Sequence, residues 1–162
     1  MKQALLLVAA CAVLLGGVLL FAGKRQTSSI AEVTDRTTRE VALACDPGMA
    51  QVYHIHPVLS IIVDGEKVGI PSDVGVRSTC MTVLHTHTPD GVIHVESPEK
   101  RDFTLADFFA VWEQSFSKDK ILSYEADADH RIRITVDGIE VDTYENTILR
   151  DAQHIVITYE SI

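Results

Sequence analysis

Two pairs of histidines in this sequence have the alternating spacing that places both side chains on one face of a β-strand. His54 and His56 form the first His-x-His pair, and His85 and His87 form the second. Residues i and i+2 of a strand point to the same side. Neutral imidazole nitrogens are common ligands of zinc, copper and iron, so each pair supplies half of a transition-metal site.

A third histidine and a carboxylate follow the second pair across a predicted turn. Residues 88–91 read Thr-Pro-Asp-Gly, which is typical of a turn because proline presets φ and glycine accepts a positive φ. The strand expected after this turn runs back and can bring His94 and Glu96 opposite His85 and His87. The predicted metal ligands are therefore His54, His56, His85, His87, His94 and Glu96.

Two other interpretations of the histidine cluster stay open. Histidines also sense pH or make ordinary structural hydrogen bonds. His130 and His154 have no comparable neighbours in the sequence, and we predict no role for them.

Two cysteines, Cys45 and Cys80, lie outside the apolar N-terminal segment. In an oxidising compartment, two cysteines in a small domain most simply form a disulfide. In the alternative, Cys80 is a thiolate ligand beside His85, which would favour copper(I). The sequence favours the disulfide and does not exclude the thiolate.

The first 25 residues are predicted to be a membrane anchor or a signal segment. Residues 4–23 form a run of 20 residues without a charge, bounded by Lys2 and by Lys24-Arg25. This length suits a transmembrane helix. The small residues that precede a signal-peptide cleavage site are imperfect here, which favours an uncleaved anchor over a cleaved signal peptide.

The rest of the chain is expected to be a polar tether, residues 26–42, followed by a single extracytoplasmic domain, residues 43–162. All 23 acidic residues lie after residue 25, with 11 of the 14 basic ones, which gives this part a net charge of −12. Nucleic acid is excluded as an expected partner because its phosphates need a basic surface. We expect a single-pass protein of the cell membrane, with its domain on the periplasmic or extracellular side.

The fold class expected from the patterning is α+β, with mostly antiparallel β-hairpins and one principal amphipathic helix. Asp64-Gly65 and Asp137-Gly138 each stand between β-branched runs, which predicts two hairpins. Residues 59–65 and 132–138 share the pattern apolar-x-apolar-x-Val-Asp-Gly, and a β-rich run follows each. The halves are either a duplicated β unit or two ordinary hairpins.

The helix is predicted to begin after Thr104. Thr104 is a good N-cap, and Asp107 stands three residues later as in a capping box. Apolar residues then recur at helical spacing from Leu105 to Phe116, so the helix is expected to bury this face in the core.

The motifs between Tyr53 and Trp112 resemble those of a family of small extracytoplasmic prokaryotic proteins. They are His-x-His, then Cys…His-Thr-His…Gly-x-Ile-His-x-Glu, and then Phe-Thr-Leu-x-x-Phe-Phe-x-x-Trp. The resemblance supports a site on the histidines and implies no particular activity.

The sequence therefore favours a membrane-tethered protein that binds copper or zinc. No nucleophile elbow, phosphate loop or zinc-protease helix motif is present, so a metal-dependent enzyme is the second hypothesis, without a substrate. The third is a structural or assembly module of a membrane complex. A metal-transfer protein or a membrane complex is the macromolecular partner that these hypotheses imply.

Overall fold

The computed structural model of the chain describes residues 36–48 and 51–162. The predicted membrane anchor and residues 26–35 of the predicted tether lie outside the described residues. Within the described part, no helix is long and apolar enough to cross a membrane. Residues 37–162 form one unit by their internal contacts.

Both predicted hairpins are confirmed. The first joins β3 (Val58–Val63) to β4 (Glu66–Val68), and the second joins β11 (His130–Val136) to β12 (Ile139–Val141). Each turn is an Asp-Gly pair with positive φ at both residues, 50° and 87° in the first turn and 51° and 81° in the second. Two consecutive positive φ angles are the requirement of the tight turns that suit the twist of antiparallel strands.

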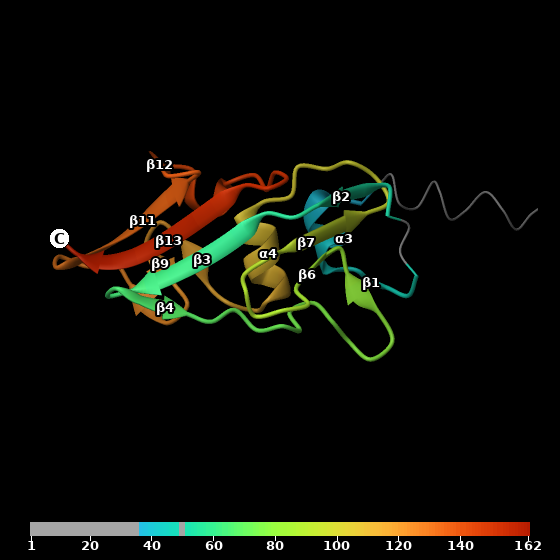
Figure 1. Cartoon of the computed structure of the whole chain (residues 1–162), viewed down its shortest axis with the longest axis horizontal. Helices are drawn as coiled ribbons and strands as arrows, with labels where there is room; N and C mark the ends of the chain where they lie inside the picture. Colours follow the sequence, from blue (N-terminus) through green and yellow to red (C-terminus); the bar gives the residue numbers. More distant parts are fainter. Residues whose placement is uncertain (1–35, 49–50) are drawn as a thin grey trace, which may run out of the picture. The chain divides into compact units, whose positions relative to one another are not determined.

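The two hairpins are joined into one five-stranded sheet by the strand β13 (His154–Ser161). The strand order is β12-β11-β13-β3-β4. β13 pairs antiparallel with β11 and parallel with β3, so the sheet is mostly antiparallel with one parallel pairing (Figure 1). Apolar side chains alternate along these strands and bury one face of the sheet. The buried residues are Leu59, Ile61, Val63, Ile132, Ile134, Ile155, Ile157 and Tyr159.

The similarity of the two halves is confined to the hairpins. The β-rich run after the second hairpin becomes β13, the central strand of the large sheet. The run after the first hairpin instead supplies two short strands, β5 (Met81–Thr82) and β6 (Leu84–His85), which belong to other sheets. The third strands of the two units therefore occupy different places.

The helix α4 (Leu105–Val111) begins where the sequence predicts. The Asp107 carboxylate accepts hydrogen bonds from the backbone nitrogen of Thr104 at 2.9 Å and from its hydroxyl at 3.0 Å. The helix is shorter than expected, because Glu113 has φ 58° and Phe116 lies in the strand β8 (Phe116–Ser117). The Phe116 ring still lies 4.9 Å from that of Phe109, so the aromatic residues pack together without one continuous helix.

The second sheet is the one that positions the histidines. It has the order β2-β7-β6, with β2 spanning Tyr53–Ile55 and β7 spanning His94–Ser97. The chain passes directly from β2 to β3 through His56-Pro57, so the two sheets share one continuous segment (Figure 1). The remaining elements are α3 (Thr38–Leu43), β1 (Cys45–Asp46), β9 (Lys120–Ile121), β10 (Tyr124–Glu125) and the 3₁₀ turn Tyr144–Asn146.

Candidate metal centre

The strand β7 lies between β2 and β6, and it supplies the middle of the site. In the pairing with β6, His94 lies opposite His85, as the sequence predicts. In the pairing with β2, Glu96 lies opposite His54. Directly paired residues project from the same face of a sheet, so these four side chains gather on one face. Contrary to the expectation from the sequence, Glu96 does not lie opposite either histidine of the second pair, because the register pairs Leu84 with Val95 and sets Glu96 beside Val83.

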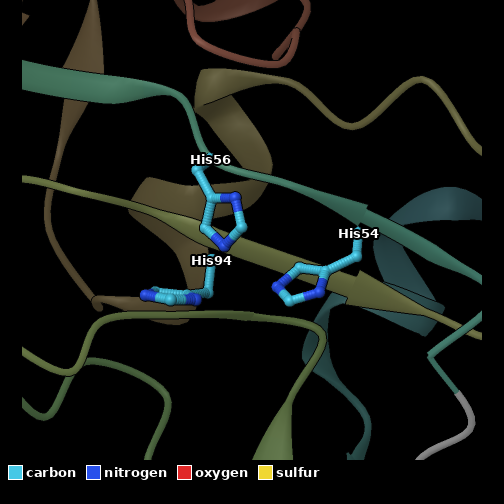
Figure 2. Close-up of side chains that lie close together, drawn as sticks. All are labelled: His54, His56 and His94. Carbon is cyan, nitrogen blue, oxygen red and sulfur yellow. The ribbon is translucent and has the colours of Figure 1, made fainter.

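Five histidines meet on this face. Their ligand atoms fall into two groups of three, each within 4.8 Å of one another. The first triad is His54, His56 and His94, and the second triad is His85, His87 and His94. The rings of the first triad lie close together, and those of His54, on β2, and His56, just after it, point toward His94 of β7 (Figure 2). The structure thus brings all five predicted histidines together.

The distances between the nitrogens of each triad are close to those around a bound transition-metal ion. Nitrogens that bind one zinc ion at about 2.0–2.1 Å in tetrahedral geometry lie roughly 3.3 Å apart. The Nε2 atoms of His85 and His87 are already 3.1 Å apart. His54 and His87 are exposed, so their rings can rotate to bring the wider nitrogen pairs to ligand spacing.

His85 is held ready to be a ligand. Its side chain is completely buried, and its Nδ1 lies 2.9 Å from the carbonyl oxygen of Thr82. A carbonyl only accepts hydrogen bonds, so Nδ1 carries the proton and the Nε2 lone pair faces His87. Burial lowers the pKa of His85, and the Thr82 carbonyl and Glu96 only partly oppose this effect. A neutral imidazole with a fixed tautomer is the form that binds a metal.

His94 carries a polar atom without a partner. Its Nδ1 is buried and accepts or donates no hydrogen bond within the described residues. The nearest carboxylate oxygen, Oε1 of Glu96, is 3.9 Å away. Burial, followed by repulsion from His87, His56 and His85, lowers the pKa of His94. An unpartnered nitrogen costs about 1–3 kcal/mol when buried, and a metal ion bound to it would remove that cost.

Glu96 lies next to the first triad, beside His54. The side chain is buried, and its Oε1 lies 3.2 Å from Nε2 of His54. The amide nitrogen of Gln51 donates to its other oxygen. A carboxylate that accepts a hydrogen bond from Nε2–H of His54 leaves the Nδ1 lone pair of this ring free for a metal. Glu96 therefore orients a ligand in this arrangement.

Three residues at the site were missed by the sequence interpretation. Thr82 supplies the carbonyl that fixes His85, and Gln51 holds Glu96. Asp151 accepts a hydrogen bond from the backbone nitrogen of His56 at 3.0 Å. Thr82 is only three residues from His85, but a backbone carbonyl leaves no signal in the sequence. The Gln51–Glu96 contact depends on β-pairing, and Asp151 lies on a loop almost a hundred residues after His56, which local patterns do not encode.

Cys45 and Cys80 are joined by a disulfide, with their Cα atoms 5.4 Å apart. Neither sulfur is therefore a free thiolate ligand in this structure. The bridge ties β1 to β5, where Cys45 lies opposite Thr82. The backbone that presents a carbonyl to His85 is thus fastened by the disulfide.

The two other histidines lie away from the cluster. His130 is next to Asp127, at 3.0 Å, and its ring stacks on that of Tyr159. His154 is exposed at the start of β13. Neither belongs to a triad.

Comparisons with protein families, curated proteins and solved structures find no match for this chain. The family resemblance of the motifs stays a prediction.

Proposed function

We propose that this chain is a transition-metal-binding protein that uses the histidine cluster on β2, β7 and β6, with copper or zinc as its ion. The observation that carries the proposal is the buried, unpartnered Nδ1 of His94 at the junction of two histidine triads. A domain rarely leaves a buried polar atom unsatisfied, and transition metals bind imidazole nitrogen well.

The location of the protein is part of the same proposal. The uncharged run of residues 4–23 supports a membrane anchor, and the disulfide suits an oxidising compartment. The acidic charge of the chain after residue 25 would attract metal cations. We therefore propose a membrane-tethered, extracytoplasmic metal carrier, buffer or sensor that exchanges its ion with a partner protein.

A metal-dependent enzyme is the second candidate. Each triad offers three protein ligands, which is the number that leaves a coordination position open for water or substrate at catalytic zinc sites. Glu96 would be the group nearest the first triad that could move a proton. The substrate class is not indicated by any residue at the site.

The test is the metal content of the full-length protein, purified in detergent with any affinity tag removed. Elemental analysis should find about one copper or zinc ion per chain, and His94→Ala should lose it because both triads use this residue. The control is His154→Ala, which removes an exposed histidine outside the cluster.

If the wild-type protein neither retains nor takes up copper or zinc, under oxidising or reducing conditions, the proposal fails. The cluster is then a pH-responsive surface or an interface of a membrane assembly.

A further inference from the structure

The two triads share a single residue. His94 belongs to both, whereas His54 and His56 appear only in the first and His85 and His87 only in the second. The His94 ring lies 4.8 Å from that of His56 and 4.6 Å from that of His87. It therefore stands between one exposed pair of histidines and another pair that includes the buried His85.

A neutral imidazole has one lone pair, because its second nitrogen carries the proton. His94 can therefore serve one ion at a time unless it also loses that proton. Two fully occupied triads would also place two cations close together around one shared ring, and like charges at that distance repel strongly. The shared histidine limits the cluster to one ion in either of two positions.

The two positions differ in how their ligands are held. In the first triad, the side chains of His54 and His56 are 39% and 44% exposed. In the second triad, His87 is exposed, but His85 is completely buried and its tautomer is fixed by the Thr82 carbonyl. An exposed site is reached quickly from solvent, whereas a preorganised ligand loses less conformational entropy on binding and holds the ion more tightly.

The carboxylates near the cluster favour the first triad as the position where an ion binds first. The carboxylate of Glu96 lies 3.2 Å from His54, and that of Asp151 lies 4.0 Å from His56. Asp151 lies beside the first triad, and Glu96 lies beside His54 and, at 3.9 Å, beside the shared His94. Together they lower the energy of a cation that approaches the first triad. The first triad is thus the position that solvent and charge favour for capture.

Resting on the proposed function, we propose that the cluster is a two-position site. An ion is captured by the first triad and passed to the second, and His94 is the ligand common to both positions. The transfer exchanges His54 and His56 for His85 and His87, so the ion is never released from the protein between the two positions. No bond other than metal coordination changes, and no redox partner is needed.

The experiment uses Zn²⁺ with the full-length protein in detergent and follows binding by stopped flow with a competing fluorescent zinc indicator. The capture variant is His54→Ala/His56→Ala, and the holding variant is His87→Ala. All three side chains are at least partly exposed, so the variants are expected to fold. His154→Ala is the control.

The wild-type protein should bind one zinc ion per chain. The capture variant should also bind one ion, with its association and dissociation rates both slowed at least about tenfold and its equilibrium affinity little changed. The holding variant should keep the fast association rate, and its dissociation rate should rise at least about tenfold.

Other results would overturn the two-position site and leave the proposed function intact. They are two zinc ions per wild-type chain with similar affinities, or a capture variant that loses affinity while its association rate is unchanged. A wild-type protein that binds neither zinc nor copper would instead overturn the proposed function itself.

Discussion

His94 and Glu96 are the two residues whose chemistry is least explained by folding alone. Both are on β7, His94 with an unpartnered buried nitrogen and Glu96 with a carboxylate placed between Gln51 and His54. Buried polar and charged groups cost free energy unless they are paired. A metal ion bound to His94 and to the His54 that Glu96 orients would account for both residues on this short strand.

The carboxylate of Glu96 can be tested without a change of shape. Glu96→Gln keeps the side-chain volume but removes the negative charge of the carboxylate beside Nε2 of His54. We expect metal affinity to fall by about 10–100-fold, as for other groups that orient metal-binding histidines. Affinity is measured by competition with a chelator of known strength.

The matched control is Glu66→Gln on the exposed strand β4, which should leave the affinity unchanged. If Glu96→Gln binds metal as tightly as the wild type, the carboxylate serves only the fold.

The stability of the metal-free protein should depend on pH in a defined direction. Burial lowers the pKa of His85 and of His94 below the ordinary value of 6.5. The unfolded chain therefore takes up protons at these residues at a higher pH than the folded chain does. Their contribution to stability is complete above pH 6.5 and is lost as the pH falls from 6.5 through the lower pKa values of the folded state.

Urea denaturation at a series of pH values measures this effect. The free energy of unfolding should be level above about pH 7 and should fall steadily as the pH is lowered to about 5. The variant His154→Ala should follow the same curve. An unfolding free energy that stays constant across this range would contradict the lowered pKa values of His85 and His94.

At the scale of the elements, the sequence predicted what short segments determine. The Asp-Gly turns need positive φ at two adjacent residues, and the capping box joins Thr104 to Asp107 within one helical turn. Both features are therefore determined by a few consecutive residues of the sequence. The end of α4 was missed because the positive φ of Glu113 is unusual for that residue. The pairing of β6 with β7 across the 88–91 turn was predicted, but the pairing of β2 with β7 was missed because these strands are separated by nearly forty residues.

The turn before β7 contains a glycine, Gly91, at a position where any other residue would clash with the backbone. Gly91 has φ +92°, and a Cβ atom built there would lie 2.1 Å from the carbonyl oxygen of Leu59. The same segment is fastened to β3, since the Leu59 nitrogen donates to the Gly91 oxygen at 2.8 Å. Any shift of this turn moves His94, which follows three residues later.

We therefore expect Gly91→Ala to destabilise the domain and to weaken metal binding. The control is Gly138→Ala, which has φ +81° but no atom within 4 Å of the added Cβ. Both changes carry the left-handed backbone penalty of about 1–2 kcal/mol. Only Gly91→Ala adds a clash, worth a further ~1–3 kcal/mol in the free energy of unfolding. Equal losses in the two variants would contradict the close packing of this turn.

The disulfide stabilises the fold and also holds a backbone group that contacts the site. It joins residues 35 positions apart, for which the chain-entropy contribution is roughly 3–4 kcal/mol. Cys45→Ser/Cys80→Ser should lose stability of this order. It should also bind metal more weakly, because β1 no longer holds the Thr82 carbonyl against His85.

Chemical denaturation and chelator competition measure the two effects separately. Cys11→Ser, which removes a cysteine outside the described residues, is the control. Loss of stability with unchanged metal affinity would mean that β5 keeps the Thr82 carbonyl in place without the bridge.

At the scale of the whole domain, the strands that carry the histidines also contribute to the hydrophobic core. The buried apolar residues of both sheets and of α4 form a single hydrophobic cluster that includes Val95 of β7 and Leu84 of β6. The histidines lie on the opposite face of the same short strands. Strands of two to four residues have little stability of their own, so the geometry of the triads depends on this shared core.

Metal binding should therefore stabilise the whole domain and not only the cluster. A ligand that binds only the folded state adds about 2.7 kcal/mol when its free concentration is 100 times its Kd. For a unit of the size of residues 37–162, this corresponds to a rise in Tm of roughly 10 °C. We expect this rise on addition of zinc to the wild-type protein, followed by the near-ultraviolet circular dichroism of its buried aromatic residues.

Two variants separate a specific effect from general stabilisation by a divalent cation. His94→Ala should show no rise, because neither triad is complete without it, whereas His154→Ala should show the full rise. Magnesium, which prefers oxygen ligands, should leave the wild-type Tm unchanged. Equal rises in Tm for His94→Ala and the wild type would place the ion elsewhere on this acidic chain. The Tm of His94→Ala therefore decides whether metal binding at the triads stabilises the whole domain.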